Sequence, residues 1–243
     1  MPESYLIVGG SSDIAIILAK RLLNNGSSVT VLARDVSRCE ELQALGVEVV
    51  QGDALNPESV NQAVRTSLER GGGTIAGVAH MVGSMLIRPP HAIKIDDFNE
   101  VIHTNLSTAF LTLSIACKAM LRSGGGRVVF MSSVAASLGL VNHEAIAAAK
   151  GGIESMVRSA ASTYSQRGIR VNAVAPGLTE TRLAENILKS DAIREAAVGM
   201  IPLKKINQPD EIASTIEWLL CQAPDNLTGQ ILHLDGGMSN IRN

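Results

Sequence analysis

The sequence predicts an α/β fold, a doubly wound parallel sheet of about seven strands with helices on both faces. Short runs rich in β-branched residues alternate with longer segments of helical period, which is typical of repeated βαβ units. Several of the short runs are apolar nearly throughout, as expected for strands of a sheet that is covered on both faces. The two patterns together predict the sheet and its two helical layers.

The expected strands are short apolar runs that begin and end near polar or glycine-containing segments. In chain order they are YLIVG (5–9), SVTVLA (28–33), VEVVQG (47–52), IAGVAHMV (75–82), RVVFMS (127–132), IRVNAVA (169–175) and QILHLD (230–235). Each is followed by a longer segment, so successive strands are free to run parallel.

The segments between the strands have helical period, and helices are expected near 13–24, 38–45, 57–70, 96–122, 143–166 and 208–221. Glycine triplets at 71–73 and 124–126 fall where two of these helices should end, and access to positive φ suits glycine for C-terminal caps. Residues 177–207 form the longest stretch without a strand, and we expect them to fold over a ligand as a lid.

Length and composition favour a single domain, residues 1–243, with small-molecule partners. No linker or repeat divides the chain, and no apolar run approaches the roughly 18 residues of a membrane span. The net charge of −2 and the few aromatic residues argue against nucleic-acid binding. The histidines show no metal-ligand spacing, so no metal site is expected.

The chain carries three cysteines that are far apart in sequence, Cys39, Cys117 and Cys221. An odd, scattered set suits free thiols in a reducing compartment better than a disulfide framework. The N-terminus enters an apolar run without the basic region of a signal peptide. We therefore expect a cytoplasmic protein.

The first strand leads through VGGSSDIA into an amphipathic helix, an arrangement that predicts a phosphate site. Free backbone N–H groups at a helix N-terminus point outward at the positive end of the helix dipole. Gly9 supplies the tight turn, Ser11 and Ser12 supply hydroxyl groups, and Ile14 lies in the first helical turn. These residues are the expected phosphate contacts.

This glycine-rich turn and a set of later motifs resemble the short-chain dehydrogenase/reductase family, whose members have Rossmann-type folds. The family fingerprint G-x-x-x-G-x-G corresponds to Gly9, Asp13 and Ala15, so two of its three glycines are replaced. The Asp13 carboxylate falls near the expected pyrophosphate, and we expect it to point away or to cap the turn. The resemblance implies binding of a nicotinamide dinucleotide.

Further matches follow in family order along nearly the whole chain. Asp53 and the adjoining Ala54 correspond to the adenine contact, and Gly83 closes HMVG where the family has N-N-A-G. The resemblance implies that Asn105 and Ser133 are active-site residues and that Lys150 holds the nicotinamide ribose. It also implies a nicotinamide-lining segment within NAVAPGLTET, formed by Pro176, Gly177, Thr179 and Thr181.

The residues after the second strand bear on cofactor choice. An acid at position 33 would accept hydrogen bonds from the ribose of NAD, but the sequence has Ala33 followed by Arg34. A guanidinium there can pair with a 2′-phosphate. We therefore expect NADP(H) to be preferred over NAD(H), the alternative being that Arg34 is a solvated surface residue.

The family's proton donor is a tyrosine four residues before the lysine, and that position is Ile146 here. Tyr5 should lie at the opposite end of the sheet, and Tyr164 is about 21 Å beyond Lys150 along the same helix. His143 returns to the face of Lys150 and, as a neutral imidazole, can donate a hydrogen bond to a carbonyl. The alternative is that His143 is an exposed polar residue in a turn capped by Asn142.

The predicted function is an NADP(H)-dependent oxidoreductase that transfers hydride to a carbonyl or activated C=C substrate. Ser133 polarises the substrate oxygen, Asn105 fixes a water chain, and His143 replaces the missing tyrosine as donor. Two alternatives remain: a catalytically silent homologue that binds NADP(H) as a sensor or scaffold, and a subunit that has lost the cofactor. The family resemblance implies a homo-tetramer or dimer, and the sequence does not predict the substrate.

Overall fold

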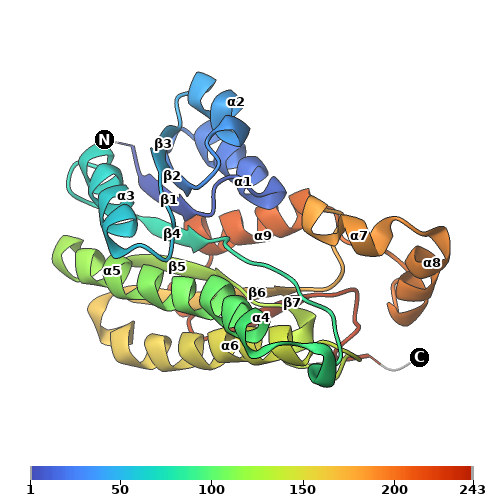
Figure 1. The fold of residues 1–243 in the computed structure, drawn as a ribbon. Coiled ribbons are helices and arrows are strands. Elements are labelled where there is room, and N and C mark those ends of the chain that lie inside the picture. Colours follow the sequence, from blue (N-terminus) through green and yellow to red (C-terminus); the bar gives the residue numbers. More distant parts are fainter. Residues whose placement is uncertain (1, 242–243) are drawn as a thin grey trace.

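The computed structural model describes residues 2–241, which form one seven-stranded parallel sheet flanked by helices (Figure 1). The strand order is β3-β2-β1-β4-β5-β6-β7. The strands are β1 (Ser4–Val8), β2 (Ser28–Ala33), β3 (Glu48–Gln51), β4 (Gly77–His80), β5 (Gly126–Met131), β6 (Ile169–Pro176) and β7 (Ile231–Leu234). The predicted doubly wound sheet is confirmed, with each strand within two residues of its expected position.

The helices that cover the sheet also lie where the periodicity places them. They are α1 (Asp13–Asn24), α2 (Glu40–Ala44), α3 (Pro57–Arg70), α4 (Ile95–Ile102), α5 (Thr108–Ser123), α6 (Glu144–Tyr164) and α9 (Pro209–Cys221). Gly124 has φ 95° at the end of α5, and Gly72 and Gly73 have φ 62° and 96° just after α3, as the glycine triplets predict. Short 3₁₀ turns lie at Ser37–Cys39, Pro90–Ala92, Val134–Ala136, Ser165–Arg167 and Arg182–Ala184.

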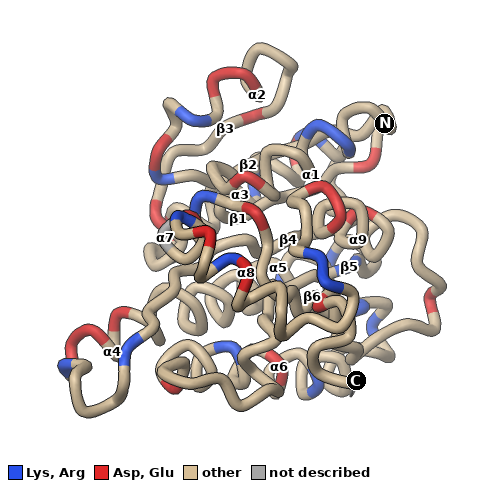
Figure 2. The backbone as a smooth tube through the Cα atoms, turned by 90° about the vertical axis from the view of Figure 1, so that its right-hand side faces the viewer, with Lys and Arg blue, Asp and Glu red and all other residues tan. Residues whose placement is uncertain are grey.

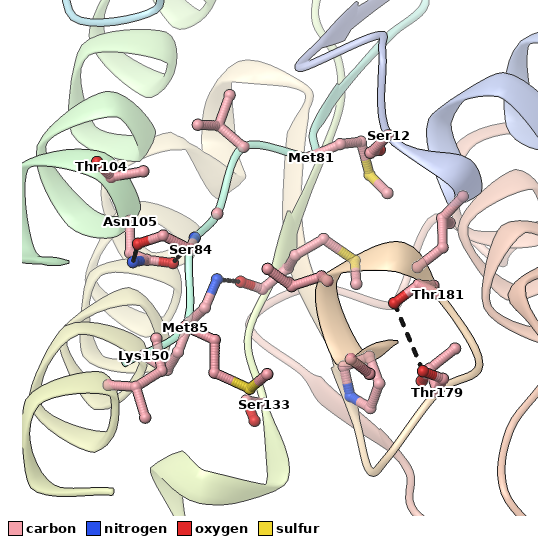
Figure 3. A pocket seen from close by; sticks show the side chains of 18 of the residues that line it. Ser12, Met81, Ser84, Met85, Thr104, Asn105, Ser133, Lys150, Thr179 and Thr181 are labelled. Carbon is pink, nitrogen blue, oxygen red and sulfur yellow. Dashed lines mark hydrogen bonds between the residues drawn. The ribbon is translucent and has the colours of Figure 1, made fainter. Parts of the chain in front are cut away.

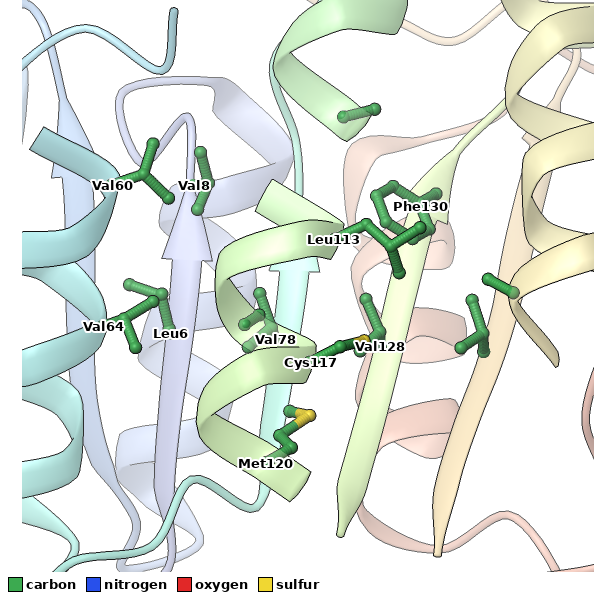
Figure 4. Packing of buried hydrophobic residues seen from close by; sticks show 14 of the residues in the cluster. Leu6, Val8, Val60, Val64, Val78, Leu113, Cys117, Met120, Val128 and Phe130 are labelled. Atoms are coloured by element: carbon green, nitrogen blue, oxygen red, sulfur yellow. The ribbon is translucent and has the colours of Figure 1, made fainter. Parts of the chain in front are cut away.

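Alternate side chains of each strand enter two separate cores, because successive residues of a strand point to opposite faces. Leu6 and Val8 of β1 belong to the core that α3, α5 and α6 cover, which is shown in Figure 4. Tyr5 and Ile7 of the same strand pack against α1 and α9. A sheet covered on both faces in this way explains the continuous apolar runs.

The expected single helix over 96–122 is wrong in one respect. A π-helical turn, His103–Ser107, separates α4 from α5. The side chain of Asn105 in this turn donates to the carbonyl oxygen of Val101, 2.9 Å away, and is held by Ser84 from outside the helix. The Val101 contact lies within one turn and the Ser84 contact is tertiary, and neither changes the helical period, so the period alone does not reveal them.

The segment after β6 forms an excursion that we call the lid segment, residues 178–207. It contains α7 (Glu185–Leu188) and α8 (Asp191–Met200), which project from the sheet in Figure 1. Its two ends are joined by a β-bridge between Thr179 and Asn207. The chain therefore leaves the sheet and returns to it at one point, as a lid requires.

Charged residues of both signs are interspersed along the backbone (Figure 2). Among residues 2–241, no helix is both long and apolar enough to cross a lipid bilayer. Over the same residues, no group of His, Cys, Asp and Glu side chains could hold a metal ion.

Candidate functional site

One cavity of about 860 Å³ opens at the carboxyl ends of the central strands. In a doubly wound sheet this is where crossovers diverge on either side of β1 and leave a crevice for a ligand. Every residue assigned to the site from the sequence borders this cavity: Gly9, Ser11, Ser12, Ile14, Arg34, Asp53, Ala54, Gly83, Asn105, Ser133, His143, Lys150, Pro176, Gly177, Thr179 and Thr181. Their individual roles remain predictions.

The turn after β1 has the geometry of a phosphate site. Gly9 has φ 92°, and a Cβ on it would lie 2.8 Å from the backbone nitrogen of Val82, so no other residue fits. Ser12 caps α1 by accepting a hydrogen bond from the N–H of Ala15 at 3.2 Å. The first residues of α1, Asp13 and Ile14, have no intrahelical acceptor for their N–H groups and border the cavity. These features fit a pyrophosphate.

The carboxylate of Asp13 is engaged by the lid segment. It accepts a hydrogen bond from the backbone N–H of Arg182 at 2.8 Å and forms an ion pair with the Nε of that guanidinium. The same guanidinium donates through Nη2 to the carbonyl oxygen of Ser11, 2.9 Å away. Asp13 therefore binds the first residue of the 3₁₀ turn Arg182–Ala184 in the lid segment, a partner that sequence analysis did not find.

The end of β2 presents two arginines to the cavity. The Arg34 side chain is 73% exposed and lies 3.9 Å from a carboxylate oxygen of Asp53. The other oxygen of Asp53 accepts from the N–H of Leu55 at 2.8 Å, which fixes the acid beside the cavity. Arg38, in the 3₁₀ turn Ser37–Cys39, also borders the cavity, and sequence analysis did not find it.

Asn105 is fully buried and holds the segment after β4. Its Oδ1 accepts from the N–H of Ser84 at 3.2 Å, and its Nδ2 donates to the Ser84 hydroxyl at 3.0 Å (Figure 3). A Cβ at Gly83 would lie 3.1 Å from Asn105 Oδ1 and 3.5 Å from Lys150 Nζ. The Asn105 amide and the Lys150 ammonium therefore both lie close to Gly83. Ser84, which was not among the predicted site residues, also joins the site.

Lys150 of α6 is buried, with its Nζ 2.8 Å from the carbonyl oxygen of Met131 (Figure 3). Burial lowers the pKa of its ammonium to about 8, because the charged form loses its hydration. Ser133 follows the same strand end, where its hydroxyl accepts from the N–H of Ala135 at 3.2 Å. That contact leaves the hydroxyl proton of Ser133 free to be donated toward the cavity.

Ile146 is 5% exposed and packs in a small apolar cluster with Val101, Ala135 and Ala149 at the cavity wall. Both tyrosines of the chain are described, and neither borders the cavity. Burial raises the pKa of Tyr5, whose hydroxyl donates to Glu3 at 2.7 Å at the far end of β1. Tyr164 is the last residue of α6.

His143 borders the cavity as the N-cap residue of α6, with its Nδ1 2.7 Å from the carbonyl oxygen of Val141. A carbonyl only accepts, so Nδ1 carries the proton in this hydrogen bond. With the proton on Nδ1, the neutral imidazole has a lone pair on Nε2, and the donor role expected for His143 stays a prediction. Asn142 does not cap the helix: it has φ 65° and precedes the N-cap residue.

The wall formed by the lid segment has a polar and an apolar part. The polar part follows β6, where the Thr179 hydroxyl donates to Gly177 at 3.0 Å and the Thr181 hydroxyl to Thr179 at 3.5 Å (Figure 3). The apolar part of the cavity wall is shared between the lid segment, the segment after β4 and the loop before α6. It includes Met85, Ile87, Leu140, Leu183, Ile187 and Met200.

Comparison with known proteins finds one family match that spans nearly the whole chain. Residues 9–239 match the family model described as enoyl-(acyl carrier protein) reductase. The 3-oxoacyl-[acyl-carrier-protein] reductase MabA of Mycobacterium tuberculosis is 29% identical over 97% of this chain and 92% of its own length. A tropinone reductase homolog of Arabidopsis thaliana is 28% identical over 98% and 92%, respectively.

Solved structures agree with this assignment. A short-chain type dehydrogenase/reductase from Mycobacterium ulcerans superposes with a TM-score of 0.92 at 28% identity, over 98% of this chain and 90% of the other. The TT0495 protein from Thermus thermophilus superposes with a TM-score of 0.89 at 28% identity, over 98% and 99%.

Proposed function

Because this chain belongs to the short-chain dehydrogenase/reductase family of NAD(P)-dependent oxidoreductases, we propose that it prefers NADP(H) and reduces an apolar carbonyl or activated C=C substrate. The observation that supports this most is the convergence of the phosphate turn, Arg34, Ser133 and Lys150 on one cavity. A substrate body of low polarity matches the apolar wall opposite the polar residues.

The cofactor preference depends on the end of β2. Arg34 and Arg38 together offer two guanidinium groups where the adenosine ribose is expected, and position 33 offers no carboxylate to a 2′-hydroxyl. A planar guanidinium pairs with a phosphate through two parallel hydrogen bonds. The 2′-phosphate therefore distinguishes NADP(H) from NAD(H) at this position.

The proposed chemistry divides the hydride and the proton between different groups. When bound, NADP(H) supplies the hydride. Ser133 donates its hydroxyl hydrogen bond to the substrate oxygen and stabilises the charge that develops there. Lys150 holds the ribose hydroxyl groups, and its buried ammonium favours negative charge in the cavity. Asn105 fixes water beside Lys150 and so connects the site to solvent.

His143 replaces the tyrosine as the proton donor, and it does so as the imidazolium. Since Nδ1 is committed to Val141, only the doubly protonated ring has a proton on Nε2 to give. A reaction that ends at a hydrogen-bonded enolate needs a weaker acid than formation of an alcohol does. For this reason the proposed substrates include activated double bonds beside ketones.

The second candidate function is a catalytically silent protein that binds NADP(H). Ile146 favours it, because an isoleucine side chain has no acidic proton to donate. The experiment that separates the two is the oxidation of NADPH with a panel of apolar ketones and enones. The proposed enzyme consumes NADPH in proportion to purified protein. Binding of NADPH with no hydride transfer to any member of the panel would favour the sensor or scaffold.

We also propose a homo-tetramer or dimer in a reducing, cytoplasmic setting. Most of the apolar face of α5 at residues 108–120 packs on the sheet, but Phe110 and Leu121 of that helix stay 62% and 45% exposed. Strand β7 forms one edge of the sheet. The three cysteines are free thiols. Light scattering in solution measures the mass, and a monomer would contradict the assembly.

A further inference from the structure

Asp13 and Arg182 connect two parts of the cavity wall that lie 169 residues apart in sequence. Asp13 is the first residue of α1, in the turn expected to hold the pyrophosphate, and Arg182 begins the 3₁₀ turn Arg182–Ala184 within the lid segment. The two residues are joined by an ion pair and by the backbone hydrogen bond of 2.8 Å. The third contact, from Nη2 to the Ser11 carbonyl at 2.9 Å, places the guanidinium over the turn itself.

The charge of Asp13 is unfavourable to a phosphate when considered alone. A carboxylate at the first position of a helix occupies the positive end of the helix dipole, where an anionic ligand also binds. Beside a pyrophosphate the two negative charges repel. The guanidinium of Arg182 cancels the carboxylate charge, so that the turn as a whole does not repel an anion.

The guanidinium of Arg182 has N–H donors that its contacts with Asp13 and Ser11 do not use. Its contacts with Asp13 and Ser11 use Nε and Nη2 and do not use Nη1, and the residue borders the cavity. A guanidinium that is fixed by a carboxylate is already oriented, so less conformational entropy is lost when it binds a phosphate. The ion pair thus fixes the guanidinium in a position from which its unused Nη1 can donate to a bound phosphate.

We infer that Arg182 is a pyrophosphate-binding residue, held over the phosphate turn by Asp13, and that this pair fixes the lid segment on the bound dinucleotide. The inference rests on the proposed function. In this chain the acid at position 13 and the arginine of the lid segment act as a unit, in place of the glycine that the family fingerprint has at that position.

The test is calorimetric titration of the full-length protein with NADPH and with adenosine 2′-monophosphate, which has the 2′-phosphate but no pyrophosphate. Arg182→Ala is expected to weaken NADPH binding at least tenfold and to leave binding of the fragment unchanged. The double variant Asp13→Ala/Arg182→Ala is expected to bind NADPH more tightly than Arg182→Ala, because no unpaired carboxylate remains beside the phosphates.

Arg194→Ala is the matched control, because Arg194 also lies in the lid segment and forms an ion pair there with Glu180, away from the phosphate turn. It is expected to bind NADPH like the wild type. An unchanged NADPH affinity in Arg182→Ala, an equal loss for the fragment, or a double variant no better than Arg182→Ala would overturn the inference. A wild-type protein that binds neither NADPH nor the fragment would instead overturn the proposed function itself.

Discussion

Ile146 and Lys150 lie one turn apart in α6, and both border the same cavity. The Cα atoms of the two residues are separated by about 6 Å along the helix axis. An apolar side chain thus comes one turn before a buried lysine. Ser133 and Asn105 remain at the site, so the binding and polarising groups are retained while the usual acid is absent. The remaining question about catalysis is which group donates the proton that the family's tyrosine would supply.

Ile146→Tyr restores a phenol one turn before Lys150, where the ammonium group stabilises the phenolate. We expect turnover of a ketone substrate to rise about tenfold or more, since a positioned general acid contributes at least that much. The assay is NADPH oxidation at saturating substrate. Ile146→Phe is the control, with the same bulk but no hydroxyl. An equal gain in both variants would assign the effect to cavity shape instead.

His143→Gln removes the proposed acid and keeps a polar side chain at the N-cap of α6. We expect turnover to fall about 100-fold, within the range of general acid catalysis. His91→Ala, an exposed histidine outside the cavity, serves as control. Unchanged turnover in His143→Gln would exclude the donor role.

Arg34→Ala removes the expected partner of the 2′-phosphate. A hydrogen bond to a charged group contributes about 1.5–3 kcal/mol, so the Kd for NADPH should rise roughly 10- to 100-fold while that for NADH stays constant. Titration calorimetry measures both. Arg65→Ala, at an exposed arginine of α3 outside the cavity, should change neither value. A parallel loss of NADH binding would show that Arg34 does not select the cofactor.

Burial lowers the pKa of Lys150 from 10.5 to about 8 in the folded protein. Between these two values the unfolded chain binds more protons, so this residue makes stability rise with pH over that window. The free-energy cost of burying the charged ammonium of Lys150 is fully present below pH 8 and is absent above pH 10.5. Relative to Lys150→Met, the wild type should gain about 2 kcal/mol between pH 7.5 and pH 10, as measured by urea unfolding. Parallel curves for the two proteins would contradict this account.

The strands and the phosphate turn were predictable from local patterns, whereas most of the other site residues were predicted from the resemblance to the short-chain dehydrogenase/reductase family. Seven apolar runs identified the sheet, and most of the residues that the family motifs marked lie near the carboxyl ends of its strands. Gly9 and Lys150 reach one cavity for this reason, although they are far apart in sequence.

The features that were missed depend on particular hydrogen bonds, which the hydrophobic period does not encode. The π turn around Asn105 has the same apolar period as a regular helix, and only the contacts with Ser84 and Val101 distinguish it. The pairing of Asp13 with Arg182 spans most of the chain and leaves no local pattern. The direction of the His143 ring is fixed by a single backbone carbonyl, which residue spacing does not reveal.

The most direct test of the account is a calorimetric titration of the purified wild-type protein with NADPH and with NADH. The proposed function predicts micromolar binding of NADPH and binding of NADH at least tenfold weaker. Equal affinity for the two dinucleotides would contradict the role of Arg34. A folded protein that binds neither would contradict the central claim, and would identify a dehydrogenase fold that serves a purpose other than hydride transfer.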